Sequence, residues 1–236
     1  VNFTLLYTSV AGFKLKAMLK NSEFKFYAAM IAGFTLFIML ELIFRCNYEV
    51  EHAFRSSAFQ VVSFITTTGL FSDDAAKWPH VTWVVLAACM FFGGSSGSTS
   101  GGIKSIRGVM LVKVIKNEFR QILHPNAVLP MKVDGYNVQM CKRVTLLAFI
   151  GLYLFLAVIC AFTMIAAGIN STNSMTITLS SLGNVGPTLG LEIGPTMSWN
   201  ELPDFAKWIS SFLMLVGRLE LFSVLVLFTP SFWKEN

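Results

Sequence analysis

Charged residues are scarce in this chain of 236 residues. Asp, Glu, Lys and Arg make up 13% of it, about half the share found in an average soluble protein. Hydrophobic residues make up 54%, and the mean hydropathy is +0.63. The formal net charge of +5 is spread along the chain rather than gathered in a basic patch, which argues against a nucleic-acid partner. These proportions also argue against a soluble enzyme or a disordered chain, and they indicate a membrane protein.

The four cysteines show neither a metal-site spacing nor a disulfide pattern. Cys46, Cys89, Cys141 and Cys160 stand far apart, without a CxxC pair or a neighbouring His cluster. We therefore interpret them as small apolar residues and expect no bound cofactor. The chain opens on Val1 without a Met, and we expect it to be a fragment or a processed piece.

Four apolar stretches are long enough to cross the hydrocarbon core of a bilayer, which takes about 20 residues. The predicted spans are 26–44, 81–97, 144–168 and 206–228. Two shorter apolar-polar stretches, 52–66 and 172–182, cannot span, and each ends in a polar run that contains glycine. We expect these two to be half-helices that enter the membrane and turn back.

A long helix, a half-helix, a glycine turn and a second long helix occur in that order twice. We therefore predict an all-α membrane protein with two helix, half-helix, helix repeats, at residues 1–123 and 142–236. A linker at 124–141 joins them. No close residue-by-residue identity relates the two copies, so the repeat is argued from pattern alone.

Basic residues gather on one side of this predicted topology. Four lysines precede the first span, and eight Lys or Arg residues lie between Lys104 and Arg143. Because loops on the cytoplasmic side carry an excess of Lys and Arg, we expect the linker and both chain ends to be cytoplasmic. Both half-helices would then enter from outside.

Glycine-containing runs follow both half-helices: Thr66-Thr67-Thr68-Gly69-Leu70 and Gly183-Asn184-Val185-Gly186-Pro187. Irregular backbone at membrane depth is tolerated only where it is buried in protein or lines a water-filled cavity. A selectivity filter uses such backbone directly, since carbonyl oxygens replace the hydration shell of a cation. Gly69 and Gly186 would supply the backbone freedom to aim carbonyls at one axis. From the residues alone, outer loops with turn glycines explain the runs equally well.

Four signatures together resemble the TrkH/KtrB potassium-uptake family. They are Phe64-Ile65-Thr66-Thr67-Thr68-Gly69-Leu70, His124-Pro125-Asn126-Ala127-Val128, Leu182-Gly183-Asn184-Val185-Gly186-Pro187 and Gly217-Arg218-Leu219-Glu220-Leu221-Phe222. The resemblance covers nearly the whole chain. It implies a potassium-channel-like pore of four repeats on one chain, of which this sequence resembles the third and fourth, half of a pseudo-fourfold pore.

The resemblance also implies the ion-binding residues and the surroundings of the pore. K⁺ would be the transported ion, bound in a filter formed by Thr67, Thr68, Gly69, Leu70, Asn184, Val185, Gly186 and Pro187. Two further filter strands are missing, so the missing N-terminal half or a second copy would have to complete the pore. The implied setting is the bacterial inner membrane, with lipid contact, a homodimer and cytoplasmic nucleotide-binding regulatory subunits. Coupling of K⁺ to H⁺ or Na⁺ in symport stays open.

A Gly/Ser run at residues 93–102 interrupts the apolar pattern that extends from Val81 to about Leu123. Each glycine costs about 1 kcal/mol relative to Ala in a helix, so we predict a break. The resemblance implies an intramembrane gate beneath the filter, with glycines Gly93, Gly94, Gly97, Gly101 and Gly102. A static kink is the alternative. A phosphate loop is excluded, because Gly102-Ile103-Lys104-Ser105 inserts a residue into the required Gly-Lys-Ser pattern.

Arg218 lies in the middle of the predicted span 206–228. An arginine at the bilayer centre costs at least about 2.5–3.5 kcal/mol, so it must face protein or water. The resemblance implies a place beneath the filter, where its charge would form part of the barrier to cations. The alternative is a structural ion pair. Glu220 cannot face Arg218 on one helix at a spacing of two, so Glu41 or a loop carbonyl is the predicted partner.

Two functions from other classes stay open. Gly93-Gly94-Ser95-Ser96-Gly97 matches the G-x-S-x-G pattern, which would make Ser95 the nucleophile of an intramembrane hydrolase. Its weakness is the lack of a base, because His52, His80 and His124 all fall in predicted loops or interfacial segments. The other alternative is a non-conducting membrane scaffold. The sequence favours passive potassium uptake through a carbonyl-lined filter, without bond chemistry.

Overall fold

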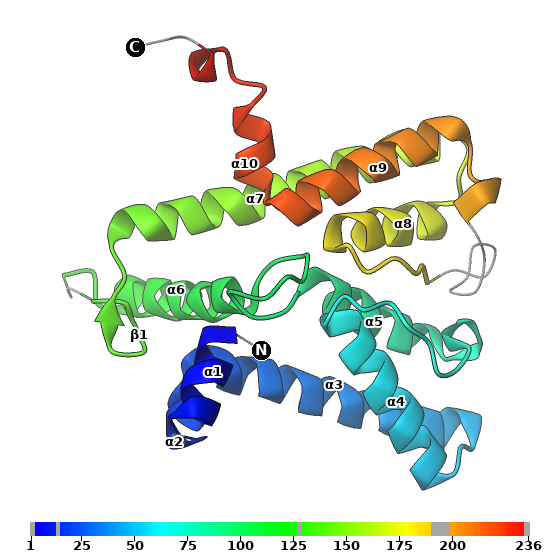
Figure 1. Cartoon of the computed structure of the whole chain (residues 1–236), viewed down its shortest axis with the longest axis horizontal. Coiled ribbons are helices and arrows are strands. Elements are labelled where there is room, and N and C mark those ends of the chain that lie inside the picture. Colours follow the sequence, from blue (N-terminus) through cyan, green and yellow to red (C-terminus); the bar gives the residue numbers. More distant parts are fainter. Residues whose placement is uncertain (1–2, 13–14, 127–128, 190–198, 234–236) are drawn as a thin grey trace.

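The computed structural model describes residues 3–12, 15–126, 129–189 and 199–233. These residues form helices almost throughout (Figure 1). Within them the only sheet is an antiparallel hairpin of β1 (Lys132–Val133) and β2 (Tyr136–Asn137). The hairpin lies between two groups of helices that follow one another in the chain.

The first group is built around the long helix α3 (Ser22–Cys46). Asn21 caps its start by accepting a hydrogen bond from the Phe24 N–H at 2.9 Å, and left-handed Asn47 ends it. The other elements of this group are α1 (Phe3–Ala11), α2 (Leu15–Lys20), α4 (Val50–Ile65), the 3₁₀ turn Ala75–Lys77, α5 (His80–Phe91) and α6 (Ser105–Leu123).

The second group repeats the order of a long helix, a short one and a further helix. Asn170 caps the short helix through the N–H of Thr172, and left-handed Asn184 ends it. The elements are α7 (Met140–Ala166), α8 (Ser171–Gly183), the 3₁₀ turn Trp199–Glu201, α9 (Asp204–Leu219), α10 (Leu221–Val226) and the 3₁₀ turn Pro230–Phe232.

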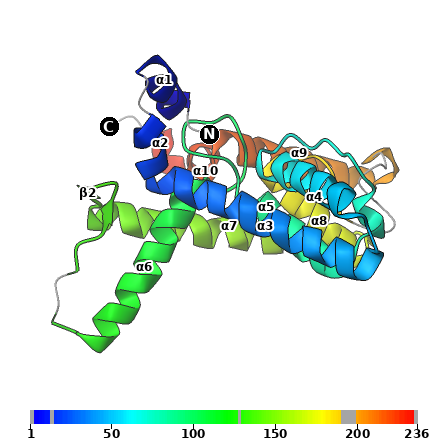
Figure 2. The same ribbon diagram turned by 90° about the horizontal axis from the view of Figure 1, so that it is seen from below.

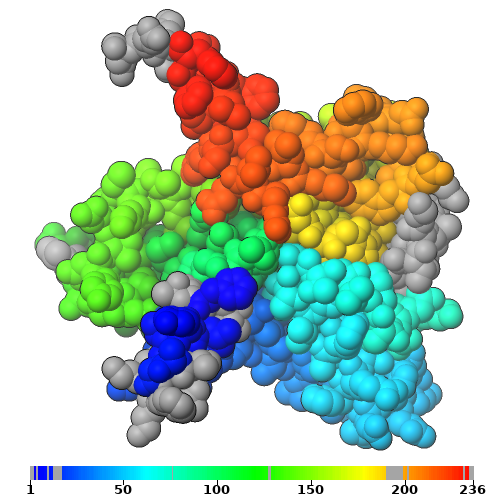
Figure 3. Space-filling view, in the orientation of Figure 1, coloured from blue at the N-terminus to red at the C-terminus, as the bar shows by residue number. Residues whose placement is uncertain are grey.

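The two groups share their hydrophobic cores. Val185 and Leu189, which follow α8, are buried in the core of the first group. Ile103, which precedes α6, is buried in the core of the second. Helices α5 and α8 also contact each other. In the space-filling view the orange and yellow atoms of the second group meet the cyan atoms of the first along one face (Figure 3). The segments after the two half-helices are therefore held by residues from both repeats.

Two of the four predicted spans are confirmed and two are wrong in extent. Helices α3 and α7 are long and apolar enough to cross a membrane. Helix α3 contains the predicted span 26–44, and α7 covers the predicted span 144–168 except for its last two residues. The short helices α4 and α8 match the predicted half-helices. The span expected at 81–97 stops at Phe91, and the span expected at 206–228 divides at Glu220 into α9 and α10.

Each early stop has its own physical cause. Phe92 takes an extended conformation and pairs with Ile103, because the Gly/Ser run between them loops out of the helix. Glu220 has φ 65° and ψ 137°, a backbone region that residues other than glycine avoid. This conformation ends α9 and starts α10 in a new direction (Figure 1).

Helix α6 projects away from the other helices (Figure 2). The hairpin is fastened to it, because Lys113 Nζ donates to the Lys132 carbonyl at 2.7 Å. A small core of Val114, Met131 and Leu146 joins α6, the hairpin segment and α7. The stretch predicted as the linker 124–141 therefore contains a packed hairpin.

Candidate ion filter and gate

The segments that follow the two half-helices lie against each other. A Cβ built on Gly69 would come within 2.2 Å of the Val185 carbonyl oxygen and 3.0 Å of Pro187 Cδ. Only a residue without a side chain permits this approach. The structure thus brings together the two runs that the sequence predicted as filter strands.

Both runs have the same backbone pattern. Thr67 and Gly69 have φ of 55° and 72°, and Asn184 and Gly186 have φ of 54° and 106°. The residue between each pair keeps a negative φ. Alternation between positive and negative φ turns successive N–H groups to one side of the backbone and carbonyls to the other. Thr67 is β-branched, so its positive φ is a strained conformation of the kind that clusters at functional sites.

The N–H groups of both runs point back into their half-helices. The Thr68 N–H donates to the Ser63 carbonyl at 2.9 Å, and the Val185 N–H donates to the Ser180 carbonyl at 3.0 Å. The Gly186 N–H donates to Ser180 Oγ at 3.1 Å. Ser63 and Ser180 thus occupy equivalent places in the two repeats.

The carbonyl oxygens of both runs lie on the opposite side of the backbone from these N–H groups, and several of them accept no hydrogen bond from the part of the chain that the structure describes. Among the described residues, no N–H or O–H donates to the carbonyls of Thr67, Thr68, Gly69, Val185 or Gly186. The Leu70 carbonyl differs, since it accepts from Ser63 Oγ at 2.7 Å. Both runs also begin at the carboxyl ends of α4 and α8, where the helix macrodipole places about half a negative charge. Free carbonyls beside two such ends can bind a cation.

The Gly/Ser loop, residues 93–102, is closed at its base by backbone hydrogen bonds. The Gly93 N–H donates to the Ile103 carbonyl at 3.0 Å, and the Ile103 N–H donates to the Phe91 carbonyl at 3.0 Å. Ser105 donates from its N–H to the Gly94 carbonyl at 3.1 Å and from Oγ to the Gly93 carbonyl at 3.0 Å. The loop leaves and re-enters the helix pair α5 and α6 at one point.

The loop packs directly against the start of the second glycine run, Gly183-Asn184-Val185-Gly186-Pro187. A Cβ on Gly101 would lie 2.4 Å from the Gly183 carbonyl oxygen and 2.8 Å from Asn184 Cβ. A Cβ on Gly93 would lie 1.9 Å from the Gly101 carbonyl oxygen. Gly97 and Gly102 adopt positive φ of 77° and 70°. The glycines therefore allow a backbone packing that no other residue fits.

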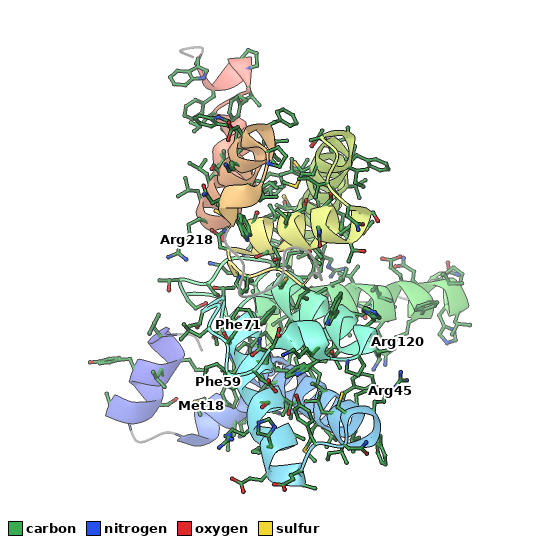
Figure 4. All side chains as sticks on the ribbon, turned by 90° about the vertical axis from the view of Figure 1, so that its right-hand side faces the viewer. Met18, Arg45, Phe59, Phe71, Arg120 and Arg218 are labelled. Atoms are coloured by element: carbon green, nitrogen blue, oxygen red, sulfur yellow. The ribbon has the colours of Figure 1, made fainter. Side chains whose placement is uncertain are left out.

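Arg218 is the next-to-last residue of α9, so the expected place in the middle of a long helix is wrong. Its guanidinium donates to the Thr99 carbonyl in the Gly/Ser loop. Figure 4 shows the side chain exposed at the margin of the molecule, pointing away from its helix. The predicted loop-carbonyl partner is confirmed. Glu41 is not the partner, because it pairs with Arg45 at 2.7 Å.

An ionic cluster lies beside Arg218. Glu220 pairs with Lys104 at 3.4 Å and with Arg107 at 3.0 Å. The Arg107 guanidinium also stands 3.9 Å above the Phe149 ring. Together with Arg218 these groups line a cavity of about 150 Å³ between the Gly/Ser loop and the end of α9. Three basic groups face one carboxylate, so the cavity carries excess positive charge.

The sequence did not indicate this cluster, nor a second contact of the loop. In the sequence, Lys104 and Arg107 are only two of the basic residues on the predicted cytoplasmic side. Glu23 in α3 is buried, with 4% of its surface exposed, and its carboxylate accepts from the Ser96 N–H and, at 2.8 Å, from Ser96 Oγ. An acid in the first turn of a helix is common, so nothing in the pattern distinguished it.

The hydrolase alternative lacks a base. Ser95 is buried. His52 packs against Tyr48, His80 packs against Trp83, and His124 follows the end of α6. Within the described ranges, no hydrogen bond joins a histidine to Ser95.

The fold is that of a helical membrane protein with two helix, half-helix, helix repeats, whose half-helices end at adjoining glycine runs. The chain belongs to the TrkH family of cation transport proteins, because the family model matches residues 21–235.

Named relatives and a solved structure support this family assignment. The chain is 32% identical over 234 residues, 99% of its length, to the Trk system potassium uptake protein TrkH of Halomonas elongata. It is 34% identical over 237 residues to TrkH of Escherichia coli K12. It spans 48% of the length of both relatives. The crystal structure of the potassium transporter TrkH from Vibrio parahaemolyticus superposes with a TM-score of 0.92 at 33% identity, covering 99% of this chain and 50% of that one.

Proposed function

We propose that this chain is the C-terminal half of a potassium uptake protein of the bacterial inner membrane. Its relatives are named as potassium uptake proteins, which points to a transporter and away from an enzyme. One observation carries the proposal. Both runs after the half-helices have left-handed residues at the same two places, with carbonyls that no donor occupies among the described residues.

K⁺ would bind to carbonyl oxygens of these runs in place of its hydration shell. The proposed filter residues are Thr67, Thr68, Gly69, Leu70, Asn184, Val185, Gly186 and Pro187. The N–H groups are tied to Ser63 and Ser180, so the carbonyls are held in place rather than reoriented when the ion arrives. The proposed filter needs four strands around one axis. The N-terminal half of the protein would supply the other two.

The Gly/Ser loop would close the path below the filter. It packs against Gly183 and Asn184, at the start of the fourth strand. Arg218 holds it through the Thr99 carbonyl, and the excess positive charge of the neighbouring cavity opposes the passage of cations. Opening would break the contact between Arg218 and Thr99 and move the loop aside.

The orientation follows from the basic residues. The hairpin of the linker contacts the start of α3, so these two segments lie on one face of the molecule. Because these segments carry many of the Lys and Arg residues, that face would be cytoplasmic. Both ends of the chain would lie on the same side, and the half-helices would enter the membrane from outside. Cytoplasmic nucleotide-binding subunits and a second copy of the protein would be the partners, with lipid around the rest.

The test is rubidium flux into liposomes that contain the intact parent protein, with Na⁺ as competitor. We expect selective flux that Gly69→Ser degrades, because the new Cβ would meet the Val185 carbonyl at 2.2 Å. The matched control is Gly151→Ala in α7, where a Cβ meets nothing within 4 Å. Absence of flux with cytoplasmic partners present would contradict the proposal and favour a scaffold role.

A further inference from the structure

Glu23 is a buried acid whose partners lie in the Gly/Ser loop. It is the second residue of α3, and only 4% of its surface is exposed. Both donors to its carboxylate belong to Ser96, the backbone N–H and the hydroxyl. Among the Lys, Arg and His side chains that the structure describes, none lies within ion-pair distance of it. The loop therefore supplies the hydrogen-bond donors to this carboxylate, in addition to the favourable field at the start of α3.

This burial couples the position of the loop to Glu23. A buried carboxylate without donors is strongly unfavourable, and hydrogen bonds to a charged group are about twice as strong as neutral ones. If the loop moved away while Glu23 stayed in place, both donors would be lost at once. Movement of the loop therefore requires that Glu23 move as well, or that it find other donors.

The residues just before Glu23 are bound to the linker hairpin. Asp134, in the turn between β1 and β2, accepts from the Ser22 N–H at 2.8 Å and from Asn21 Nδ2 at 3.2 Å. The hairpin is also tied to α6, since Lys113 donates to the Lys132 carbonyl at 2.7 Å. It thus contacts the start of α3 and the helix that follows the loop.

We propose that Glu23 is the positioning residue that holds the Gly/Ser loop in its closed position, and that the hairpin controls this contact through Asp134. Displacing the hairpin pulls on Asn21 and Ser22 and withdraws the adjacent Glu23 from Ser96. The inference rests on the proposed function of the loop as a gate. It adds a second contact, independent of Arg218, that keeps the loop closed. It also gives a route by which movement of the linker hairpin opens the loop.

The test follows movement of the loop separately from ion flux. Ser95 is 3% exposed and lies next to Ser96, so Ser95→Cys in the intact protein reports opening by its rate of maleimide labelling, read site by site by mass spectrometry. We expect Glu23→Gln to speed labelling by about tenfold, because charge-assisted hydrogen bonds are lost. Labelling of the native Cys89, which is fully buried, should stay unchanged, since only the loop moves.

Glu118→Gln is the matched control, since Glu118 is an exposed acid on α6. In the Ser95→Cys protein, Glu118→Gln should leave the rate of maleimide labelling unchanged. Equal rates in Glu23→Gln and Glu118→Gln would overturn the inference. Faster labelling of Cys89 together with Ser95→Cys would also overturn it, because that result indicates general loosening.

Two further variants test the contact without altering Glu23, should Glu23→Gln fail to fold. Ser96→Ala removes one of the two donors, and Asp134→Ala removes the carboxylate that binds the start of α3. Each should speed labelling by about threefold. Unchanged labelling in both would overturn the inference.

Flux distinguishes this inference from the proposed function. If the intact protein carries K⁺ selectively and Glu23→Gln changes neither labelling nor basal flux, only the inference fails. If labelling rises as expected but no variant conducts under any condition, the loop contact stands and the proposed function fails. With both correct, Glu23→Gln raises labelling and basal rubidium flux together.

Discussion

Gly69 and Gly186 occupy equivalent positions but differ in their surroundings. Both have positive φ, yet a Cβ on Gly69 would strike the Val185 carbonyl at 2.2 Å, and a Cβ on Gly186 would meet nothing within 4 Å. Substitution at Gly186 therefore adds only backbone strain, whereas substitution at Gly69 adds strain and a collision. The two proposed filter runs are alike in backbone and unequal in packing.

We predict that Gly69→Ala destabilises the intact protein more than Gly186→Ala. A left-handed residue with a Cβ costs about 1–2 kcal/mol, and overpacking adds about 1–3 kcal/mol. Thermal unfolding in detergent measures both variants against the parent protein. Equal loss of stability would mean that Gly69 and Val185 do not lie in contact.

Arg218→Ala should raise basal rubidium flux, because it removes the contact with the Thr99 carbonyl and one positive charge of the cavity. Arg45→Ala is the control, since Arg45 is exposed and pairs only within α3. A flux like that of the parent protein would favour the static kink over the gate.

The sequence predicted the role of some residues of the candidate site and not of others. Gly69 and Gly186 stand out as glycines in polar runs after apolar segments, and both adopt positive φ. Thr67 does not stand out, because no pattern marks a β-branched residue for a left-handed conformation. Glu23 is missed for another reason. Its importance depends on Ser96, which lies 73 positions further along the chain.

At the scale of helices, length and hydrophobic pattern predicted α3, α7 and both half-helices. The break after α5 was also predictable, since glycine and serine are poor helix formers. The break at Glu220 was not, because Leu219, Glu220 and Leu221 form an ordinary helical sequence. Ion pairs with Lys104 and Arg107, more than a hundred positions away, accompany that break.

Helix α9 approaches α8 closely at Gly217. A Cβ there would lie 2.1 Å from the Leu182 carbonyl oxygen and 2.6 Å from Asn184 Nδ2. We predict that Gly217→Ala separates the two helices and lowers stability by about 1–3 kcal/mol. The change would also disturb the Asn184 amide, which donates to the Met214 carbonyl at 3.1 Å.

Thermal unfolding of the intact protein tests this, with Gly33→Ala in α3 as the control. A Cβ on Gly33 meets nothing within 4 Å, so this change should be neutral or stabilising. Equal stability of the two variants would contradict the packing of α9 on α8.

At the scale of the whole molecule, the chain would supply two of the four filter strands of the proposed pore. Pattern predicted the two repeats, but it could not show that Val185 enters the core of the first repeat or that Ile103 enters the core of the second. Such exchanged residues depend on packing between distant segments. Val185 packs in the same core as Phe64 and Ile65, beside the first glycine run.

We predict that this half alone carries no selective flux in liposomes, because two strands cannot surround an ion. Coexpression with the N-terminal half of its parent should restore rubidium uptake. A coexpressed N-terminal half with its own filter glycines substituted is the control. Selective flux from the C-terminal half alone would show that two copies suffice.

The most direct test of the central claim is to locate the ion. Crystals of the intact protein grown with rubidium should show anomalous density at coordination distance from the carbonyl oxygens of Thr67, Thr68, Gly69, Val185 and Gly186. Sodium-grown crystals should lack that density. Rubidium density elsewhere in the protein, with none at these carbonyls, would contradict the assignment of the two runs as filter strands.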